Sequence, residues 1–194
     1  MTVELIRHGS TALQSRGCYQ GRRTDVPLSP EGIAALCPAE LPPERVYTTG
    51  LRRTAETAAL LFPGAERIAV PALEEMDFGR FEGKNFEELS DDPDYRAWVE
   101  GGCLGRCPGG ESKEEFCRRV CCAFSDLLDG AREERVVIVA HSGTLMAALE
   151  RYALPRRDYF SWHVPCGAGY LLDASAWRGT RRLTLLGERN YCKE

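Results

Sequence analysis

The stretch VELIRHGST, residues 3–11, decides the fold class and points to the chemistry. Val3 to Ile6 is a mostly apolar run rich in branched residues, which is typical of a buried strand. The chain then turns polar, with the guanidinium of Arg7 beside the imidazole of His8. Gly9 follows directly, and a residue without a Cβ lets the backbone approach a ligand closely. Because ligands of α/β folds bind at the carboxyl ends of sheet strands, this junction is a candidate site.

The pair Arg7 and His8 suits phosphate chemistry. An arginine presents a fixed fork of donors that matches a phosphate group. A neutral imidazole nitrogen can attack phosphorus and carry the phosphoryl group covalently. Taken alone the pair is weak evidence, because most histidines only complete a local hydrogen-bond network. Its significance depends on which residues elsewhere in the chain join it.

Length, composition and charge limit the possible classes of protein. The chain has 194 residues, of which 43% are hydrophobic and 28% charged, and this is typical of one globular domain spanning residues 1–194. The formal net charge of −4, with no basic block, argues against a nucleic-acid partner. We find no run of membrane-spanning length and no signal-peptide pattern, so we expect a cytoplasmic protein with no membrane association. Monomer and homodimer both stay open.

The nine cysteines are an odd number and accompany no export signal. This favours reduced thiols in a cytoplasmic protein over a disulfide framework. Cys117, Cys121 and Cys122 lie close together on a predicted helix, but no matching CxxC pair or histidine-rich segment accompanies them. We therefore expect no metal site, and interpret the cysteines mainly as small buried hydrophobic residues.

Strand and helix patterns alternate along the chain, which predicts an α/β sheet with helices on both faces. We expect a single-domain, three-layer αβα sandwich around a mixed, mostly parallel sheet. The predicted strands cover residues 3–6, 45–49, 67–70, 135–140, 159–164, 168–173 and 181–186. The predicted helices cover residues 30–37, 51–62, 113–129 and 144–152, with one or two more short helices within 84–100. The helix near 113 is opened by a capping box of Ser112 and Glu115.

A second junction repeats the design of the first. The strand at 135–140 ends in His141, followed by Ser142 and Gly143, and a helix then begins. If the two strands lie side by side, His8 and His141 face one pocket. The alternative is a capping or core histidine, and the repeated context argues against it.

Two further segments carry candidate groups. Residues 48–58 form a strand-to-helix junction with hydroxyls and two arginines, Arg52 and Arg53, at the helix start, where an anion can bind. Residues 73–83 place Glu75 and other acids beside phenylalanine and glycine. A carboxyl group partly desolvated by aromatic rings has a raised pKa and can donate a proton. The alternatives are solvated surface arginines and a plain acidic surface loop.

Together these segments resemble the histidine phosphatase (phosphoglycerate mutase-like) superfamily, in the family's order and over nearly the whole chain. Residues 19–21 and 25–32 also resemble the family's segment after the first motif. The motifs that carry the resemblance are RHG at 7–9 with Thr11, Leu51 with Arg53 and Thr57-Ala58, Glu75 before DFGRFEG at 77–83, and HSG at 141–143.

The resemblance implies a role for each matched residue. His8 would be the nucleophile that becomes phosphohistidine, and Arg7 and Arg53 would bind the phosphoryl oxygens. His141 would donate a hydrogen bond to the phosphoryl group. Glu75 would protonate the leaving alcohol and then activate water. No metal or cofactor is required. The implied phosphate- and substrate-binding residues are Arg7, Gln14, Gln20, Gly21, Arg53, Ser142 and Gly143.

The chain also departs from the family's pattern at several positions. Many members carry asparagine at the position of Gln14 and Ser-Ser-Pro at that of residues 48–50, and the segment 22–24 is one residue longer than usual. We expect Arg22, Arg23, the loop after residue 80 and residues 101–112 to form the substrate-pocket walls.

Within the family, the short interval between residues 84 and 140 resembles small phosphatases more than mutases. One such group is the α-ribazole phosphatases of cobalamin biosynthesis. We therefore expect a phosphomonoesterase acting on a small-molecule phosphate ester, with α-ribazole 5′-phosphate as a candidate substrate. A phosphoglycerate mutase-type phosphotransferase and a non-catalytic phospho-ligand binding module are the alternatives. His163 is either a substrate contact or, as we prefer, a strand histidine packed near Trp162.

Overall fold

A computed structural model describes residues 1–193, which build one seven-stranded sheet with the order β3-β2-β4-β1-β6-β7-β5. Strand β6 runs antiparallel to its neighbours β1 and β7, and the other neighbouring pairs are parallel. The predicted mixed, mostly parallel sheet is confirmed. The strands are β1 (Thr2–Arg7), β2 (Arg45–Thr48), β3 (Glu66–Ala69), β4 (Arg135–Ala140), β5 (Ala153–Leu154), β6 (Ala168–Asp173) and β7 (Leu183–Asn190).

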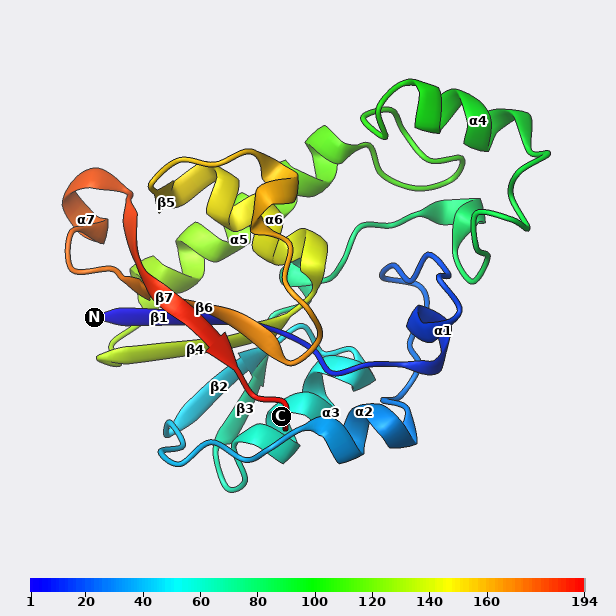
Figure 1. The fold of residues 1–194 in the computed structure, drawn as a ribbon. Helices are drawn as coiled ribbons and strands as arrows, with labels where there is room; N and C mark the ends of the chain where they lie inside the picture. The colour runs from blue at the N-terminus through cyan, green and yellow to red at the C-terminus, as the bar shows by residue number, and fades with distance from the viewer. Residues whose placement is uncertain (194) are drawn as a thin grey trace.

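Helices cover both faces of the sheet (Figure 1). Helices α5 (Lys113–Gly130) and α6 (Ser142–Tyr152) lie on one face, and α2 (Pro30–Ala35) and α3 (Arg52–Leu61) lie on the other. Residues of β4 alternate between the two cores, because successive side chains of a strand point to opposite faces. Val136 and Ile138 belong to the core with Phe116 and Leu145, whereas Val137 and Val139 belong to the core with Ala58 and Leu61.

Local signals place the helix starts. Ser112 and Glu115 form both bonds of the predicted capping box at the start of α5. Ser29 caps α2 by accepting a hydrogen bond from the amide of Gly32, with proline at the first helical position. The remaining short elements are α1 (Ala12–Ser15), α4 (Pro93–Glu100), α7 (Trp177–Thr180) and the 3-10 turns η1 (Pro71–Leu73), η2 (Gly79–Phe81) and η3 (Tyr159–Trp162).

Some predicted elements differ from the structure. The prediction of a strand at 159–164 is wrong. These residues begin with the 3-10 turn η3, in which the side chains of Tyr159 and Trp162 are both buried. Aromatic residues favour strands, and that preference was overridden by this packing. Residues 84–100 contain one helix, α4. Helix α6 begins two residues before its predicted start, and β7 runs to Asn190 because it pairs along β6.

The cysteines are free thiols throughout the described chain. Only Cys18 and Cys107 are buried, and Cys122 is exposed, so the expectation of buried cysteines describes two of the nine. Across residues 1–193 no helix has the length and apolar character needed to cross a membrane.

The sheet order brings three strand ends to one edge. Strands β2, β4 and β1 are consecutive neighbours and parallel, so their carboxyl ends meet at the same edge. Helices α1 and α4 lie on the side toward which β1 runs (Figure 1). The residues immediately after these three strands therefore lie close together at this edge of the sheet.

Candidate active site

His8 and His141 lie side by side at the ends of β1 and β4. The parallel register pairs Arg7 with Ala140, so the next residue of each strand falls at the same level. The two imidazole ring centroids are 5.2 Å apart, and both side chains are buried. The two histidines are adjacent, as predicted, but only His8 of the pair lines the neighbouring cavity.

The ring of His8 is held in one tautomer. Its Nδ1 lies 2.7 Å from the carbonyl oxygen of Gly9, and since a carbonyl only accepts, Nδ1 carries the proton. The lone pair is then on Nε2. Burial, together with the nearby positive charges of Arg53 and Arg7, lowers the pKa of His8 to about 3. The imidazole is therefore neutral at physiological pH, as a nucleophile must be.

His141 is bonded at both ring nitrogens. Its Nδ1 accepts from Nε of Arg53 at 3.2 Å, so its Nε2 carries the proton and donates to Oγ1 of Thr49 at 2.9 Å. Burial and the charge of Arg53 hold the pKa of His141 well below its usual value. Thr49 contacts Thr54, whose hydroxyl donates to the carbonyl of Leu51 at 2.8 Å. Thr49 is a site residue that sequence reasoning missed, although hydroxyls after β2 were its signal.

Arg53 is fully buried and held at three points. Besides His141, it donates from Nη1 to the carbonyl of Thr24 at 2.7 Å and from Nη2 to the carbonyl of Gly21 at 3.1 Å. Its neighbour Arg52 is exposed and pairs with Glu56 on the helix surface. The structure therefore brings Arg53, and not Arg52, into the site.

Arg7 is anchored at one end of its guanidinium. Nη1 lies 3.0 Å from Nε2 of His163 and donates to the carbonyl of Val164 at 2.6 Å. The Nε of Arg7 is buried and has no partner within the described residues. The preferred interpretation of His163 as a strand histidine is wrong. His163 follows the 3-10 turn η3, is exposed and contacts Arg7.

A cavity of about 170 Å³ opens above Arg7 and His8. Three of its polar atoms are buried and have no partner within residues 1–193, namely Nε of Arg7, Nε2 of Gln20 and Oγ of Ser142. Buried donors are normally satisfied, so their convergence here is typical of a site for an anion. Its lining residues are Arg7, His8, Gln14, Cys18, Tyr19, Gln20, Glu75, Phe78 and Ser142.

Gln14 and Gly21 take part in the site in different ways. The Oε1 of Gln14 accepts a hydrogen bond from the thiol of Cys166 at 3.0 Å, which leaves its amide group to the cavity. Gly21 contributes the carbonyl that holds Arg53. A Cβ at Gly21 would overlap the carbonyl oxygen of Met76, so the residue permits this close approach.

Glu75 lies at the rim of the same cavity and is only 8% exposed. Its Oε1 accepts from the amide of Met76 at 3.0 Å, and its Oε2 accepts from the amide of Gly143 at 2.9 Å. Burial raises the pKa of Glu75, although the two amides and the charges of Arg53 and Arg7 oppose the shift. A carboxyl group with a raised pKa beside the histidine pair can act as an acid and a base.

Gly143 lies directly under Glu75, and a Cβ there would overlap the carboxyl oxygen Oε1. We expect Gly143→Ala to displace the carboxyl group and to lower kcat about 10- to 100-fold, part of what a positioned general acid contributes. The measurement is steady-state hydrolysis of an alkyl phosphate. Gly130→Ala is the matched control, because a Cβ at Gly130 meets no atom. Equal kcat values for the two variants would contradict this expectation.

A second cavity of about 320 Å³ adjoins the first and shares Tyr19, Glu75, Phe78 and Ser142 with it. Most of its wall is aromatic or apolar, and Nζ of Lys113 lies 4.0 Å from the ring centroid of Tyr159. Of the segments predicted as pocket walls, residues 101–112 contribute Cys103, whereas the loop after residue 80 contributes none of the lining residues of the two cavities. The other wall residues come from distant segments. The lining residues are Tyr19, Glu75, Met76, Phe78, Trp98, Cys103, Lys113, Ser142, Gly143, Met146, Tyr159 and Phe160.

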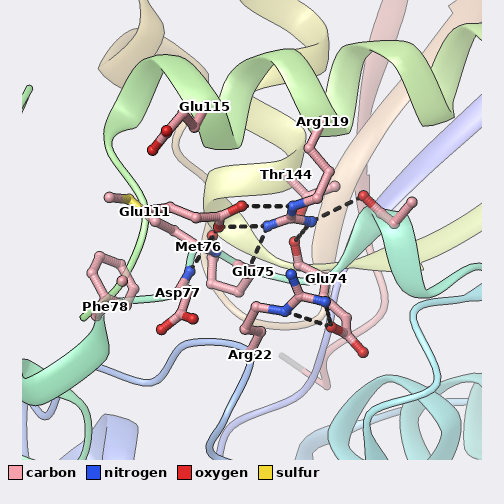
Figure 2. A network of polar contacts seen from close by, with 12 residues as sticks. Arg22, Glu74, Glu75, Met76, Asp77, Phe78, Glu111, Glu115, Arg119 and Thr144 are labelled. Atoms are coloured by element: carbon pink, nitrogen blue, oxygen red, sulfur yellow. Dashed lines mark hydrogen bonds and ion pairs between the residues drawn. The ribbon is translucent and has the colours of Figure 1, made fainter. Parts of the chain in front are cut away.

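The expected role of Arg22 and Arg23 as pocket walls is wrong. Neither residue lines the two cavities. Arg22 pairs with Glu74, as Figure 2 shows, and Arg23 pairs with Asp77. The two arginines of this segment are therefore neutralised by the acids on either side of Glu75.

The chain is similar to known phosphatases and mutases. A family model described as the histidine phosphatase superfamily (branch 1) matches residues 3–185. An adenosylcobalamin/alpha-ribazole phosphatase of Salmonella typhimurium is 29% identical over 184 residues, which cover 89% of this chain and 90% of that protein. The crystal structure of a phosphoglycerate mutase from Thermus thermophilus is 32% identical, covers 94% of this chain and 96% of that one, and has a TM-score of 0.70.

The fold is also similar to that of a further solved structure. The alpha-ribazole phosphatase from Shigella flexneri has a TM-score of 0.81, with 100% of this chain and 96% of that chain covered. The identity is 24%, so this likeness concerns the fold alone. It agrees with the predicted phosphoglycerate mutase-like architecture.

Proposed function

Because this chain belongs to the histidine phosphatase superfamily (branch 1), we propose that it is a phosphomonoesterase that acts through a phosphohistidine on His8. The observation that carries the proposal is the neutral imidazole of His8 at a cavity of unpartnered donors, with Glu75 at its rim. Residues 1–194 act in this proposal as one histidine phosphatase domain. The nine free cysteines support a cytoplasmic location.

In the first step Nε2 of His8 attacks phosphorus as the bond to the alcohol oxygen breaks. Arg7 and Arg53 offset the charge of the phosphoryl oxygens, since phosphoryl transfer depends mainly on positioning and charge stabilisation. Glu75 gives its proton to the leaving oxygen. The Nδ1–H of His8 stays bonded to the Gly9 carbonyl and stabilises the phosphorylated, cationic ring.

In the second step water attacks the phosphorus of the intermediate. The carboxylate of Glu75, now without its proton, accepts one from that water. The N–P bond breaks, phosphate leaves, and both His8 and Glu75 return to their starting protonation states. The same carboxyl group therefore serves both steps.

His141 can donate to the phosphoryl group only after its bond from Arg53 opens, because both of its ring nitrogens are bonded in the free protein. Its Nδ1 lies beside Nε of Arg53, and burial among positive charges keeps it unprotonated in the free protein. A phosphoryl dianion beside His8 draws the Nε–H of Arg53 to itself and, by opposing that field, raises the pKa of His141. Nδ1, released from Arg53, then takes up a proton from solvent and can donate it in a hydrogen bond. Gln14, Gln20 and Ser142 supply the remaining donors from the cavity wall.

The alcohol of the substrate carries a flat aromatic group in this proposal. The cavity next to the phosphate site is walled by Tyr19, Phe78, Trp98 and Tyr159, which suits ring stacking. Lys113 is the cation among its lining residues, so the aromatic wall favours a flat ring over a small carboxylate such as 3-phosphoglycerate. This supports α-ribazole 5′-phosphate, a heteroaromatic riboside phosphate. The similarity to the Salmonella adenosylcobalamin/alpha-ribazole phosphatase agrees with it.

The experiment that tests the function is phosphate release from a substrate panel. The panel contains α-ribazole 5′-phosphate, 3-phosphoglycerate, sugar phosphates, nucleotides and an aryl phosphate, each with and without 2,3-bisphosphoglycerate. We expect hydrolysis without the bisphosphate and the highest kcat/KM for the aromatic riboside phosphate. Phosphoglycerate isomerisation that requires the bisphosphate would establish a mutase instead, and binding without turnover would establish a non-catalytic module.

Phe78 lines both cavities and packs 5.2 Å from Tyr19, measured between ring centroids. We expect Phe78→Ala to raise the KM for α-ribazole 5′-phosphate about tenfold, since aromatic–base stacking contributes about 1–3 kcal/mol. The KM for a small alkyl phosphate is expected to stay nearly constant. The control is Phe86→Ala, an exposed phenylalanine outside both cavities. A parallel rise in both KM values would exclude the aromatic cavity as the alcohol site.

A further inference from the structure

Arg119 of α5 uses all five of its N–H groups on one loop and one carboxylate (Figure 2). Its Nη1 donates to the carbonyls of Ala72 and Glu74, each at 3.0 Å. Its Nη2 donates to the carbonyl of Glu75 at 3.2 Å and to Oε2 of Glu111 at 2.8 Å, and its Nε donates to Oε1 of Glu111 at 2.8 Å. An arginine has five donors, so the set is complete.

Glu111 extends this contact to the other side of Glu75. Its Oε2 also accepts from the amide of Asp77 at 2.9 Å, and its own amide donates to the carbonyl of Asp77 at 2.8 Å. Burial opposes ionisation, but the bonds from Arg119 and from the Asp77 amide hold the pKa of Glu111 below its usual value. The carboxylate is therefore charged and makes a bidentate pair, which is the stronger type.

The loop that presents Glu75 is held by bonds to other segments. Besides the bonds of Arg119 and Glu111, these include the pairs of Glu74 with Arg22 and of Asp77 with Arg23. Residues 74–78 belong to no helix or strand. Arg119 and Glu111 hold the chain on both sides of Glu75, at the carbonyls of Glu74 and Glu75 and at the peptide of Asp77. They touch its main chain only, whereas its carboxyl group is held by the amides of Met76 and Gly143.

We propose that Arg119 and Glu111 are positioning residues for proton transfer, and that they act by fixing the loop that presents Glu75. The proposal rests on the proposed function, because it concerns the acid and base of that reaction. Arg119 acts by holding the main chain of Glu75 in position. It meets the carbonyl of Glu75 and not its carboxyl group, so its removal moves the acid and leaves the phosphate contacts of Arg7, His8 and Arg53 in place.

The test compares two leaving groups. In Arg119→Gln we expect kcat/KM for an alkyl phosphate, which reports the first step, to fall about 100-fold, which is the effect of a displacement of about 1 Å. The kcat/KM for an aryl phosphate falls much less, because a good leaving group needs little protonation in the first step. The inhibition constant of inorganic phosphate stays unchanged. Arg119→Lys is expected to behave in the same way, since an ammonium group cannot span five acceptors.

Arg118→Gln is the matched control, because Arg118 directly precedes Arg119 on α5 and, within residues 1–193, pairs with exposed Glu114. Its ratio of aryl to alkyl rates should equal that of the unmodified protein. Glu111→Gln, which keeps the size of the side chain, gives a second reading should Arg119→Gln lower the thermal midpoint. For Glu111→Gln we expect the ratio of aryl to alkyl rates to change in the same direction as in Arg119→Gln, but by a smaller factor.

Equal losses for both leaving groups in the Arg119 and Glu111 variants would overturn the positioning role. That result differs from a failure of the proposed function. If the unmodified protein released no phosphate from any ester, the function itself would be wrong. If it released phosphate normally and only the ratio stayed constant, the function would stand and the positioning role would fall.

Discussion

His8→Ala is expected to abolish phosphate release, with kcat reduced about 10⁴-fold or more, because the variant lacks the atom that attacks phosphorus. The structure gives a reason for so large an effect. His8 carries the lone pair on Nε2, its tautomer is fixed by Gly9, and its pKa of about 3 keeps the ring neutral. The measurement is steady-state turnover of an aryl phosphate, whose first step depends least on Glu75.

Inorganic phosphate binding is the internal control for His8→Ala. Arg7, Arg53 and the donors of the cavity wall remain, so the variant should keep a measurable affinity for phosphate. Near-normal turnover of the aryl ester by a folded His8→Ala protein would rule out the phosphohistidine route. Loss of turnover together with loss of the folded state would be resolved by His8→Asn, which also lacks the nucleophile but keeps a polar side chain.

Glu75→Gln is expected to have the second largest effect and to depend on the leaving group. For an alkyl phosphate we expect kcat to fall about 10³-fold, within the range of a positioned general acid. For an aryl phosphate the first step needs little protonation, so hydrolysis of the intermediate, which needs a base, becomes the slow step. The alcohol is then released faster than phosphate in the first turnover.

The control is Glu74→Gln, the neighbouring residue, whose carboxylate pairs with Arg22. It should hydrolyse both esters nearly as the unmodified protein does. If Glu75→Gln slowed the aryl and alkyl esters by one common factor, with no excess of alcohol over phosphate, Glu75 would be neither the acid nor the base.

The two altered pKa values also set an expected pH dependence. His8 attacks in its neutral form, which is available above its pKa of about 3. Glu75 donates in its protonated form, and because burial raises its pKa, that form persists to higher pH than for an ordinary glutamate. The ratio of the alkyl to the aryl kcat/KM, which excludes the second step common to both esters, should therefore fall as pH rises through the pKa of Glu75. It should be flat in Glu75→Gln.

The sheet and the histidine pair were predictable because their signals are local. Apolar strands followed by polar residues mark the ends of β1 and β4, and parallel pairing alone brings His8 and His141 together. The capping box at Ser112 was predictable for the same reason. The failed strand at 159–164 shows the limit, because aromatic residues have the same strand preference whether they pair in a sheet or bury a 3-10 turn.

The rest of the site depends on contacts between segments far apart in the chain. Thr49 becomes the partner of His141 only through the sheet order, and His163 reaches Arg7 across 156 positions. The five bonds of Arg119 go to acceptors 8 to 47 residues away. A composition rich in arginine carries no signal for which arginine is buried, so the sequence does not distinguish Arg119 from the surface arginines Arg22 and Arg23.

The most direct test of the phosphohistidine mechanism is to locate the phosphoryl group on the protein. Glu75→Gln is mixed with an aryl phosphate, stopped in alkali, where phosphohistidine survives, digested, and analysed by mass spectrometry. The chain has three histidines, so the peptides are easily told apart. We expect a phosphoryl group on the peptide that carries His8. A phosphoryl group on the peptide with His141 or His163, or alcohol release with no phosphorylated peptide, would contradict the mechanism.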